Sequence, residues 1–154
     1  PIIVGNDAEN PAHLTGHDWL TNDPLTPWHQ NFIRTARQGD GFWSIRIDKT
    51  GTYEIALRRW PQEVSKPINA EMAPGAGVPG LTAFREAAGK SIAATSAVLE
   101  ISGQTIEKKV GKRDDEVRFT VDLKEGLAEL HGFFRTEGGE FDILGAYYAV
   151  VTRK

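Results

Sequence analysis

Apolar and polar side chains alternate with a period of two over residues 41–60. The apolar positions fall into two runs, Trp43, Ile45 and Ile47, then Tyr53, Ile55 and Leu57. This period is typical of β-strands with one buried face. Residues 48–51 separate the runs and end in a glycine, which suits a tight turn closed in the left-handed region. We therefore predict an antiparallel hairpin with Ile45, Ile47, Ile55 and Leu57 facing inward and Gly51 at positive φ.

The second half of the chain has the same alternation. Its apolar sets are Ala97, Leu99 and Ile101, then Val117, Phe119, Val121 and Leu123. A turn at residues 124–126 leads into a further strand, predicted to carry Leu130 and Phe134 on one face and Leu127 and Phe133 on the other. Residues 145–152 are apolar on both faces, which is the pattern of a buried strand.

Two stretches lack a regular period. Residues 6–38 are polar and hold two of the four tryptophans, which favours a long ordered loop or short strands. Residues 63–80 are interrupted by prolines and glycines and precede a predicted short helix at 81–88. We expect residues 1–154 to form a single all-β domain, an antiparallel two-sheet β-sandwich of jelly-roll type with one long irregular crossover.

Composition excludes several classes of protein. Hydrophobic residues make up 40% and charged residues 25% of the 154 residues, as in ordinary globular domains. The net charge of -3 is too small to indicate nucleic acid or an anionic membrane as a partner, and no apolar run is long enough for a membrane span. The chain has no cysteine, which excludes disulfides and thiolate sites. Because it begins at Pro1 without a signal-like segment, we expect a processed product or an excised domain.

A weak metal-site candidate lies near the N-terminus. His13 and His17 stand four residues apart, Asp18 follows, and Asp7 and Glu9 precede them. Nitrogen and oxygen donors of this kind suit zinc or another divalent ion. The surrounding sequence does not have a helical pattern that would place both histidines on one face. A solvated surface loop is therefore the favoured interpretation.

Nothing in the sequence indicates a catalytic nucleophile. The Gly-x-Ser-x-Gly elbow and the glycine fingerprints of nucleotide-binding loops are absent. The four histidines belong to no recognisable motif, and the paired carboxylates occur at predicted turns, where solvated acidic residues are common. We predict no catalytic residue in this chain.

Tryptophans in polar sequence are candidates for binding a ligand. Trp19 follows His17 and Asp18, and Trp28 precedes His29. Flat rings beside polar groups suit a sugar, because its C–H face stacks while its hydroxyls take directional hydrogen bonds. The favoured interpretation is that these rings cover an edge of the sandwich or lie in an interface with another domain.

Two arginines and a tryptophan end the second strand of the predicted hairpin. Arg58 and Arg59 precede Trp60, and arginine at a strand end can bind a carboxylate or a sulfate in a bidentate manner. A structural salt bridge, or stacking of an arginine on Trp60, is the favoured alternative.

Several segments carry a resemblance to a known family. They are residues 17–19 (His-Asp-Trp), 27–30 (Pro-Trp-His-Gln), 41–45 (Gly-Phe-Trp-Ser-Ile), 51–63 (Gly-Thr-Tyr-Glu-Ile-Ala-Leu-Arg-Arg-Trp-Pro-Gln-Glu) and 145–150 (Gly-Ala-Tyr-Tyr-Ala-Val). Together they resemble the C-terminal accessory β-sandwich region of bacterial arylsulfatase-like proteins.

The resemblance implies an exported sulfate-ester hydrolase, periplasmic or extracellular, whose catalytic domain precedes this region. That catalytic domain would hold calcium and a formylglycine formed in a Cys/Ser-x-Pro-x-Arg signature. Ser65 and Pro67 match the signature, but Asn69 stands where arginine is needed. The resemblance therefore implies a domain without the active site and without cofactors of its own.

We accordingly expect a non-catalytic β-sandwich domain that packs on a catalytic domain or helps to position a sulfated carbohydrate. The ligand or interface residues expected for this role are Trp19, Trp28, His29, Arg58, Arg59 and Trp60. A stand-alone carbohydrate-binding module is the alternative, and a small hydrolase with an unrecognised site is a third hypothesis. A groove of exposed rings would favour binding, and an apolar patch would favour packing.

Overall fold

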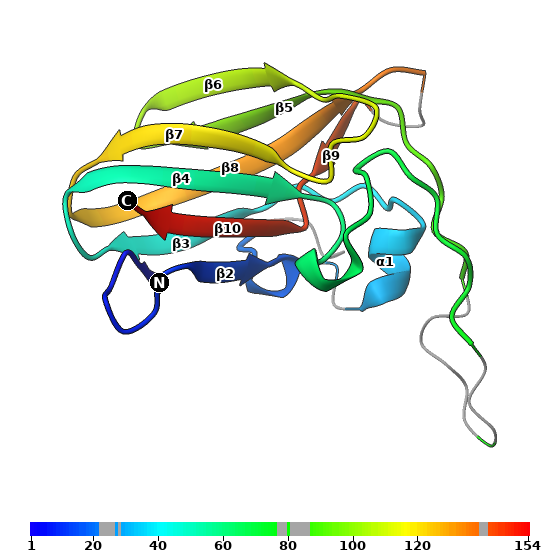
Figure 1. Ribbon diagram of the computed structural model, residues 1–154, viewed down its shortest axis with the longest axis horizontal. Coiled ribbons are helices and arrows are strands. Elements are labelled where there is room, and N and C mark those ends of the chain that lie inside the picture. Colours follow the sequence, from blue (N-terminus) through cyan, green and yellow to red (C-terminus); the bar gives the residue numbers. More distant parts are fainter. Residues whose placement is uncertain (22–26, 28, 77–79, 81–86, 139–141) are drawn as a thin grey trace.

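Two β-sheets packed face to face form the core of the structure, a computed structural model that describes residues 1–21, 27, 29–76, 80, 87–138 and 142–154 (Figure 1). The larger sheet has the order β1-β3-β8-β5-β6, with β9 paired to β8, and the smaller sheet has the order β2-β10-β4-β7. The predicted all-β sandwich is thus confirmed.

The strands of the larger sheet are β1 (Ile2–Val4), β3 (Phe42–Ile47), β5 (Ala94–Ile101), β6 (Gln104–Lys109), β8 (Gly126–Thr136) and β9 (Ile143–Gly145). Those of the smaller sheet are β2 (Ala12–Thr15), β4 (Gly51–Arg58), β7 (Val117–Leu123) and β10 (Tyr148–Arg153). The helical elements are the 3-10 helices η1 (Gly16–Asp18) and η2 (Gln62–Val64) and the α-helix α1 (Gln30–Arg34). Neighbouring strands pair antiparallel apart from β1 and β3, which are parallel.

The predicted hairpin at residues 41–60 is wrong, although its inward residues are right. Ile45, Ile47, Ile55 and Leu57 are all buried. However, β3 pairs with β1 and β8, whereas β4 pairs with β10 and β7 in the other sheet. Gly51 is also not in the left-handed region. Alternation shows which face of a strand is buried, but either sheet of a sandwich satisfies that pattern equally well.

The other predicted strands are present. The two apolar sets at 97–101 and 117–123 are buried in β5 and β7, and Leu130 and Phe134 are buried in β8. Gly126 begins β8 with φ 142°. The turn before it connects β7 of the smaller sheet to β8 of the larger one. The predicted strand at 145–152 is confirmed in part, because β9 and β10 divide it and Val150 is only half-buried.

Parts of both irregular stretches meet at one end of the sandwich. Residues 6–38 contain β2, η1 and α1, and the crossover from β4 to β5 contains η2 and a bridge between Met72 and Gly89. Helix α1 and the crossover lie at the right of Figure 1, where the backbone N–H of Lys90 donates to the carbonyl of Arg34 at 2.8 Å. The short helix predicted at 81–88 falls largely outside the described residues.

The core between the sheets is rich in aromatic side chains. Trp43, Tyr53, Phe119 and Phe134 are fully buried, and such large rings contribute much of the hydrophobic stabilisation of a small sandwich. Outside the core, Lys108 of β6 donates from Nζ to the carbonyl of Arg118 in β7 at 2.6 Å and so joins the edges of the two sheets. No helix among the described residues is long and apolar enough to cross a membrane.

Candidate functional site

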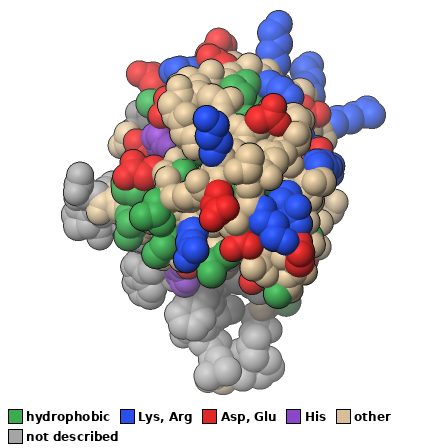
Figure 2. All heavy atoms as spheres, turned by 90° about the vertical axis from the view of Figure 1, so that its left-hand side faces the viewer, with side chains coloured by type: hydrophobic (Ala, Val, Ile, Leu, Met, Phe, Trp, Pro, Cys, Tyr) green, Lys and Arg blue, Asp and Glu red, His purple; other side chains and the backbone are tan. Residues whose placement is uncertain are grey.

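The outer face of the larger sheet carries an open cleft of about 820 Å³. Strands β3, β5, β6 and β8 form its floor, together with the turn between β5 and β6, and residues 20–21 and 40–41 form one wall. Figure 2 views the sandwich end on and shows hydrophobic, acidic and histidine side chains gathered along its left edge. A hollow that combines apolar and polar lining groups is typical of ligand-binding surfaces.

Strand register places four side chains in one row across this floor. Phe42 of β3 pairs with His131 of β8, His131 pairs with Glu100 of β5, and Glu100 pairs with Thr105 of β6. Directly opposed residues on one face of a sheet lie in contact distance, about 4.5–5.5 Å between their Cβ atoms. The preceding or following residue of each strand faces the core instead. The row therefore exists because three antiparallel pairings agree in register.

His131 is held between two carboxylates. Its Nδ1 lies 3.2 Å from Oε2 of Glu100, and its Nε2 contacts Oδ1 of Asp40. The side chain of His131 is 25% exposed, whereas those of Glu100 and Asp40 are 45% and 60% exposed. The imidazole can donate to both carboxylates at once only when both of its nitrogens are protonated. Its ring also lies against Phe133, with 5.0 Å between the ring centroids.

Apolar side chains flank this polar row. Leu127 of β8 is 77% exposed and Leu20 is 52% exposed, so both present apolar surface to the cleft. Leu20 is fixed to the edge of β3, because its backbone N–H donates to the carbonyl of Phe42 at 2.9 Å and its carbonyl accepts from Phe42 at 3.1 Å. The adjacent Thr21 donates from Oγ1 to the carbonyl of Asp40 at 2.7 Å. The wall of the cleft is therefore held to its floor.

The charge of the cleft is mainly negative. Asp40, Glu100 and Glu129 line it, and His131 is the basic side chain among the lining residues that the structure describes. Arg46 lies two register rows away on β3, opposite Leu127, where it lines a separate shallow recess with Glu125. An anion that entered the cleft would therefore meet carboxylates before it met a guanidinium.

The structure buries Arg59 and Trp60, two of the expected ligand residues. Arg59 is 0% and Trp60 is 1% exposed, and the guanidinium stacks on the Trp60 ring at 4.3 Å from its centroid. The guanidinium nitrogens of Arg59 donate to backbone carbonyls, at 2.7 Å to Lys90 and 3.3 Å to both Ile33 and Ile68. Burial lowers the pKa of Arg59 to about 10. This side chain fastens α1 and the crossover to the sandwich.

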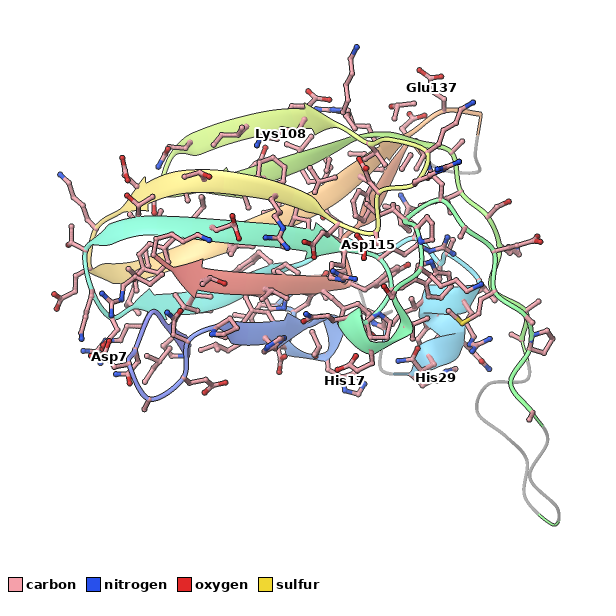
Figure 3. All side chains as sticks on the ribbon, in the orientation of Figure 1. Asp7, His17, His29, Lys108, Asp115 and Glu137 are labelled. Carbon is pink, nitrogen blue, oxygen red and sulfur yellow. The ribbon has the colours of Figure 1, made fainter. Side chains whose placement is uncertain are left out.

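Arg58 and Trp19 are also buried. Arg58 Nη2 lies 3.1 Å from Asp115 Oδ2, and Nη1 contacts Glu116; Asp115 lies beside the end of β4 (Figure 3). Trp19 is 5% exposed and stacks on Tyr147, with 5.6 Å between ring centroids. Neither side chain presents a free surface to a ligand.

Two residues of the expected aromatic site remain, Trp28 and His29. Trp28 lies outside the described residues. His29 precedes α1 (Figure 3), accepts at Nδ1 from the backbone N–H of Asn31 at 3.1 Å, and stacks on Phe32. This is the position of a helix cap, where an acceptor satisfies one of the unpaired N–H groups of the first turn. Among the described residues, none of the rings predicted from the sequence lines the cleft.

The weak metal-site candidates do not come together as ligands. His13 is exposed on β2 and His17 is exposed on η1, while Asp18 accepts from the backbone N–H and hydroxyl of Thr15 at 3.2 and 3.0 Å. In the part of the chain that the structure describes, no group of three or more histidine, aspartate or glutamate residues could hold a metal ion.

Sequence reasoning did not identify Asp40, Glu100 or His131. Glu100 and His131 occupy the outward positions of strands whose inward positions were predicted correctly. The alternation along these strands therefore indicated that both side chains face outward. Their proximity depends on the pairing of β5 with β8, which alternation does not determine. Asp40 precedes β3 in a stretch without a period.

Comparisons with known proteins do not assign the chain to a family. No protein-family model matches the chain, and no curated protein matches it. Among solved structures, the chain is similar to the crystal structure of a ruminal GH26 endo-β-1,4-mannanase, at 11% sequence identity and a TM-score of 0.44. The alignment covers 94% of this chain and 26% of that one, so the chain spans about a quarter of the length of the mannanase. We draw no conclusion about activity from this similarity.

Proposed function

We propose that this domain binds a carbohydrate without catalysing its conversion, and that the sugar lies in the cleft on the outer face of the larger sheet. The row from Phe42 through His131 and Glu100 to Thr105 carries the proposal, because it sets an aromatic ring, an imidazole, a carboxylate and a hydroxyl side by side along an open cleft.

The chemistry of the cleft suits a saccharide. A pyranose has apolar C–H faces, which Phe42, Leu20 and Leu127 can contact, and hydroxyls that require directional partners. Asp40 and Glu100 each use one carboxylate oxygen toward His131, so the other oxygen of each carboxylate is available to accept from a sugar hydroxyl. An open sheet face also accommodates a chain of sugar units better than a closed pocket would.

Binding fits the geometry better than acid-base catalysis does. A general base needs a free lone pair within reach of the substrate proton, but both ring nitrogens of His131 already face carboxylates. The contacts with His131 instead hold the carboxylates of Asp40 and Glu100 in place as hydrogen-bond acceptors for a ligand. His131 therefore does not supply the general base that the third hypothesis from the sequence, a small hydrolase, would need.

The relation to a sulfatase-like parent stays a prediction of the sequence resemblance. Asn69, which stands at the arginine position of the formylglycine signature, is engaged with β5 instead: its amide donates to the carbonyl of Ala94 at 3.0 Å and accepts from its N–H at 2.8 Å. An aryl-sulfate assay of the purified chain should therefore give no turnover. Turnover that copurifies with the chain would contradict the non-catalytic assignment.

Affinity gel electrophoresis tests the binding directly. The purified chain should migrate more slowly in gels that contain at least one member of a panel of uncharged plant, algal and bacterial polysaccharides. Glu100→Ala and Leu127→Ala should restore fast migration, because each removes an exposed group of the cleft. Thr120→Ala, on the outer face of the smaller sheet, is the matched control and should leave retardation intact. Retardation that Glu100→Ala leaves unchanged would contradict the assigned site.

A further inference from the structure

The charges along the cleft point to the class of saccharide that it takes. Asp40 and Glu100 expose a large part of their side chains, and Glu129 is exposed on the next outward position of β8. His131 is the single basic side chain among the described lining residues and is already shared between two of these carboxylates. A ligand therefore meets unneutralised negative charge.

The arginines that the sequence suggested for sulfate recognition cannot offset this charge. Arg58 is paired with Asp115 and Glu116, and Arg59 is enclosed by backbone carbonyls. Arg58 is the last residue of β4 in the smaller sheet, the other layer of the sandwich, and Arg59 follows it. Arg46 is exposed on the same face as the cleft but lies beside Glu125 and Leu127, outside the row that contains His131.

We infer that the cleft selects uncharged saccharides and discriminates against sulfated ones, an inference that rests on the proposed function. A sulfate placed a few ångströms from a carboxylate is repelled, and the repulsion is stronger beside a protein surface than in bulk water. A hydroxyl at the same point donates a hydrogen bond to that carboxylate instead. The cleft is thus expected to take an uncharged saccharide, whereas the sequence resemblance implies a sulfated one.

His131 acts as a positioning residue in this discrimination. Its two nitrogens hold Asp40, from the segment before β3, and Glu100, from β5, on either side of one ring. The charged groups that face this ring are these two carboxylates. Glu129 lies two positions before His131 on β8, and Thr105 of β6 adds a neutral hydroxyl beyond Glu100. Phe42 and Phe133 pack beside the ring and add no charge.

Paired polysaccharides test this selection. Each uncharged polysaccharide of the electrophoresis panel is compared with its chemically O-sulfated derivative by isothermal titration calorimetry. We expect the sulfated form to bind at least about tenfold more weakly to the wild type at low ionic strength. The difference should shrink when sodium chloride is added, because salt screens exposed charges within about 10 Å at 0.1 M. A purely steric effect of the sulfate groups would not respond to salt.

Two matched variants assign the effect to the cleft. Glu129→Gln removes one charge from the lining and should reduce the discrimination, whereas Glu137→Gln makes the same change at an exposed position away from the cleft (Figure 3) and should leave it unchanged. Equal or tighter binding of the sulfated form at the cleft would overturn the inference while leaving the proposed function in place. Failure of every uncharged polysaccharide to bind would overturn the proposed function itself, and this inference with it.

Discussion

Nδ1 of His131 lies 3.2 Å from Oε2 of Glu100, its register partner on strand β5. The same ring contacts Asp40 through its other nitrogen. One side chain thus links the segment before β3 to two strands of the larger sheet, and it does so at the centre of the cleft. The contribution of His131 to ligand affinity can be measured separately from its contribution to the stability of the fold.

Replacing His131 by Gln should weaken saccharide binding by about five- to tenfold and destabilise the domain by about 1 kcal/mol. A glutamine carries both of its N–H donors on one nitrogen and cannot place them at the two separate positions of the imidazole nitrogens, so Asp40 and Glu100 lose their common partner. Exposed charged hydrogen bonds of this kind contribute modestly to stability. Calorimetric titration and urea unfolding measure the two effects. Unchanged affinity in the variant would remove His131 from the account of binding.

Replacing Arg59 by Met should lower the free energy of unfolding by more than about 2 kcal/mol. The variant keeps an apolar stem but leaves the buried carbonyls of Ile33, Ile68 and Lys90 without their donor, and each unsatisfied buried group costs about 1–3 kcal/mol. Arg118→Met is the matched control, since the Arg118 side chain is 61% exposed and its ion pairs should contribute no more than about 1 kcal/mol. Equal losses in the two urea titrations would contradict the role of Arg59.

Two glycines in the same sandwich should differ in how much a larger side chain changes the stability: Gly132 should be sensitive and Gly51 tolerant. A Cβ at Gly132 would lie 2.6 Å from Cδ2 of the fully buried Leu57, so Gly132→Ala should cost about 1–3 kcal/mol. A Cβ at Gly51 meets no atom within 4 Å, and the backbone there is outside the left-handed region, so Gly51→Val should change stability by less than about 1 kcal/mol. A larger loss at Gly51 than at Gly132 in thermal or urea unfolding would contradict the assigned layers.

The three tyrosines of the chain should ionise late in the folded protein. Burial raises the pKa values of Tyr53, Tyr147 and Tyr148 above their ordinary value of 10.0, because it disfavours the phenolate. The stability contributed by these neutral phenols is therefore complete below pH 10 and is lost as the pH rises further. Tyrosinate absorbance should appear at higher pH in the native protein than in urea. Coincident titration curves would show that these side chains are not buried.

Alternation along the chain predicted the inward side chains well and the strand partners poorly. Ile45 and Ile55 are buried as expected, yet they belong to different sheets because the chain crosses the sandwich between Ile47 and Gly51. The hydrophobic period is the same in both layers, whereas pairing depends on contacts between residues far apart in the sequence.

The same distinction explains the candidate site. The polar sequence around Trp19 was compatible with an exposed ring, but burial was the favoured interpretation, and Tyr147 and Trp43 bury that ring from remote segments of the chain. Glu100 and His131 are 31 residues apart and become neighbours only through the antiparallel register of β5 and β8. A local pattern shows that each side chain faces outward, and the register of the sheet determines which side chains meet.

Chemical-shift mapping tests the central claim most directly. Amide signals of the isotopically labelled chain are followed while a bound uncharged oligosaccharide is added. The account predicts that the largest changes occur at Gly41, Phe42, Glu100, Thr105 and His131, with Thr120 on the smaller sheet unaffected. Changes concentrated on the outer face of β2-β10-β4-β7, or spread without relation to the cleft, would contradict it.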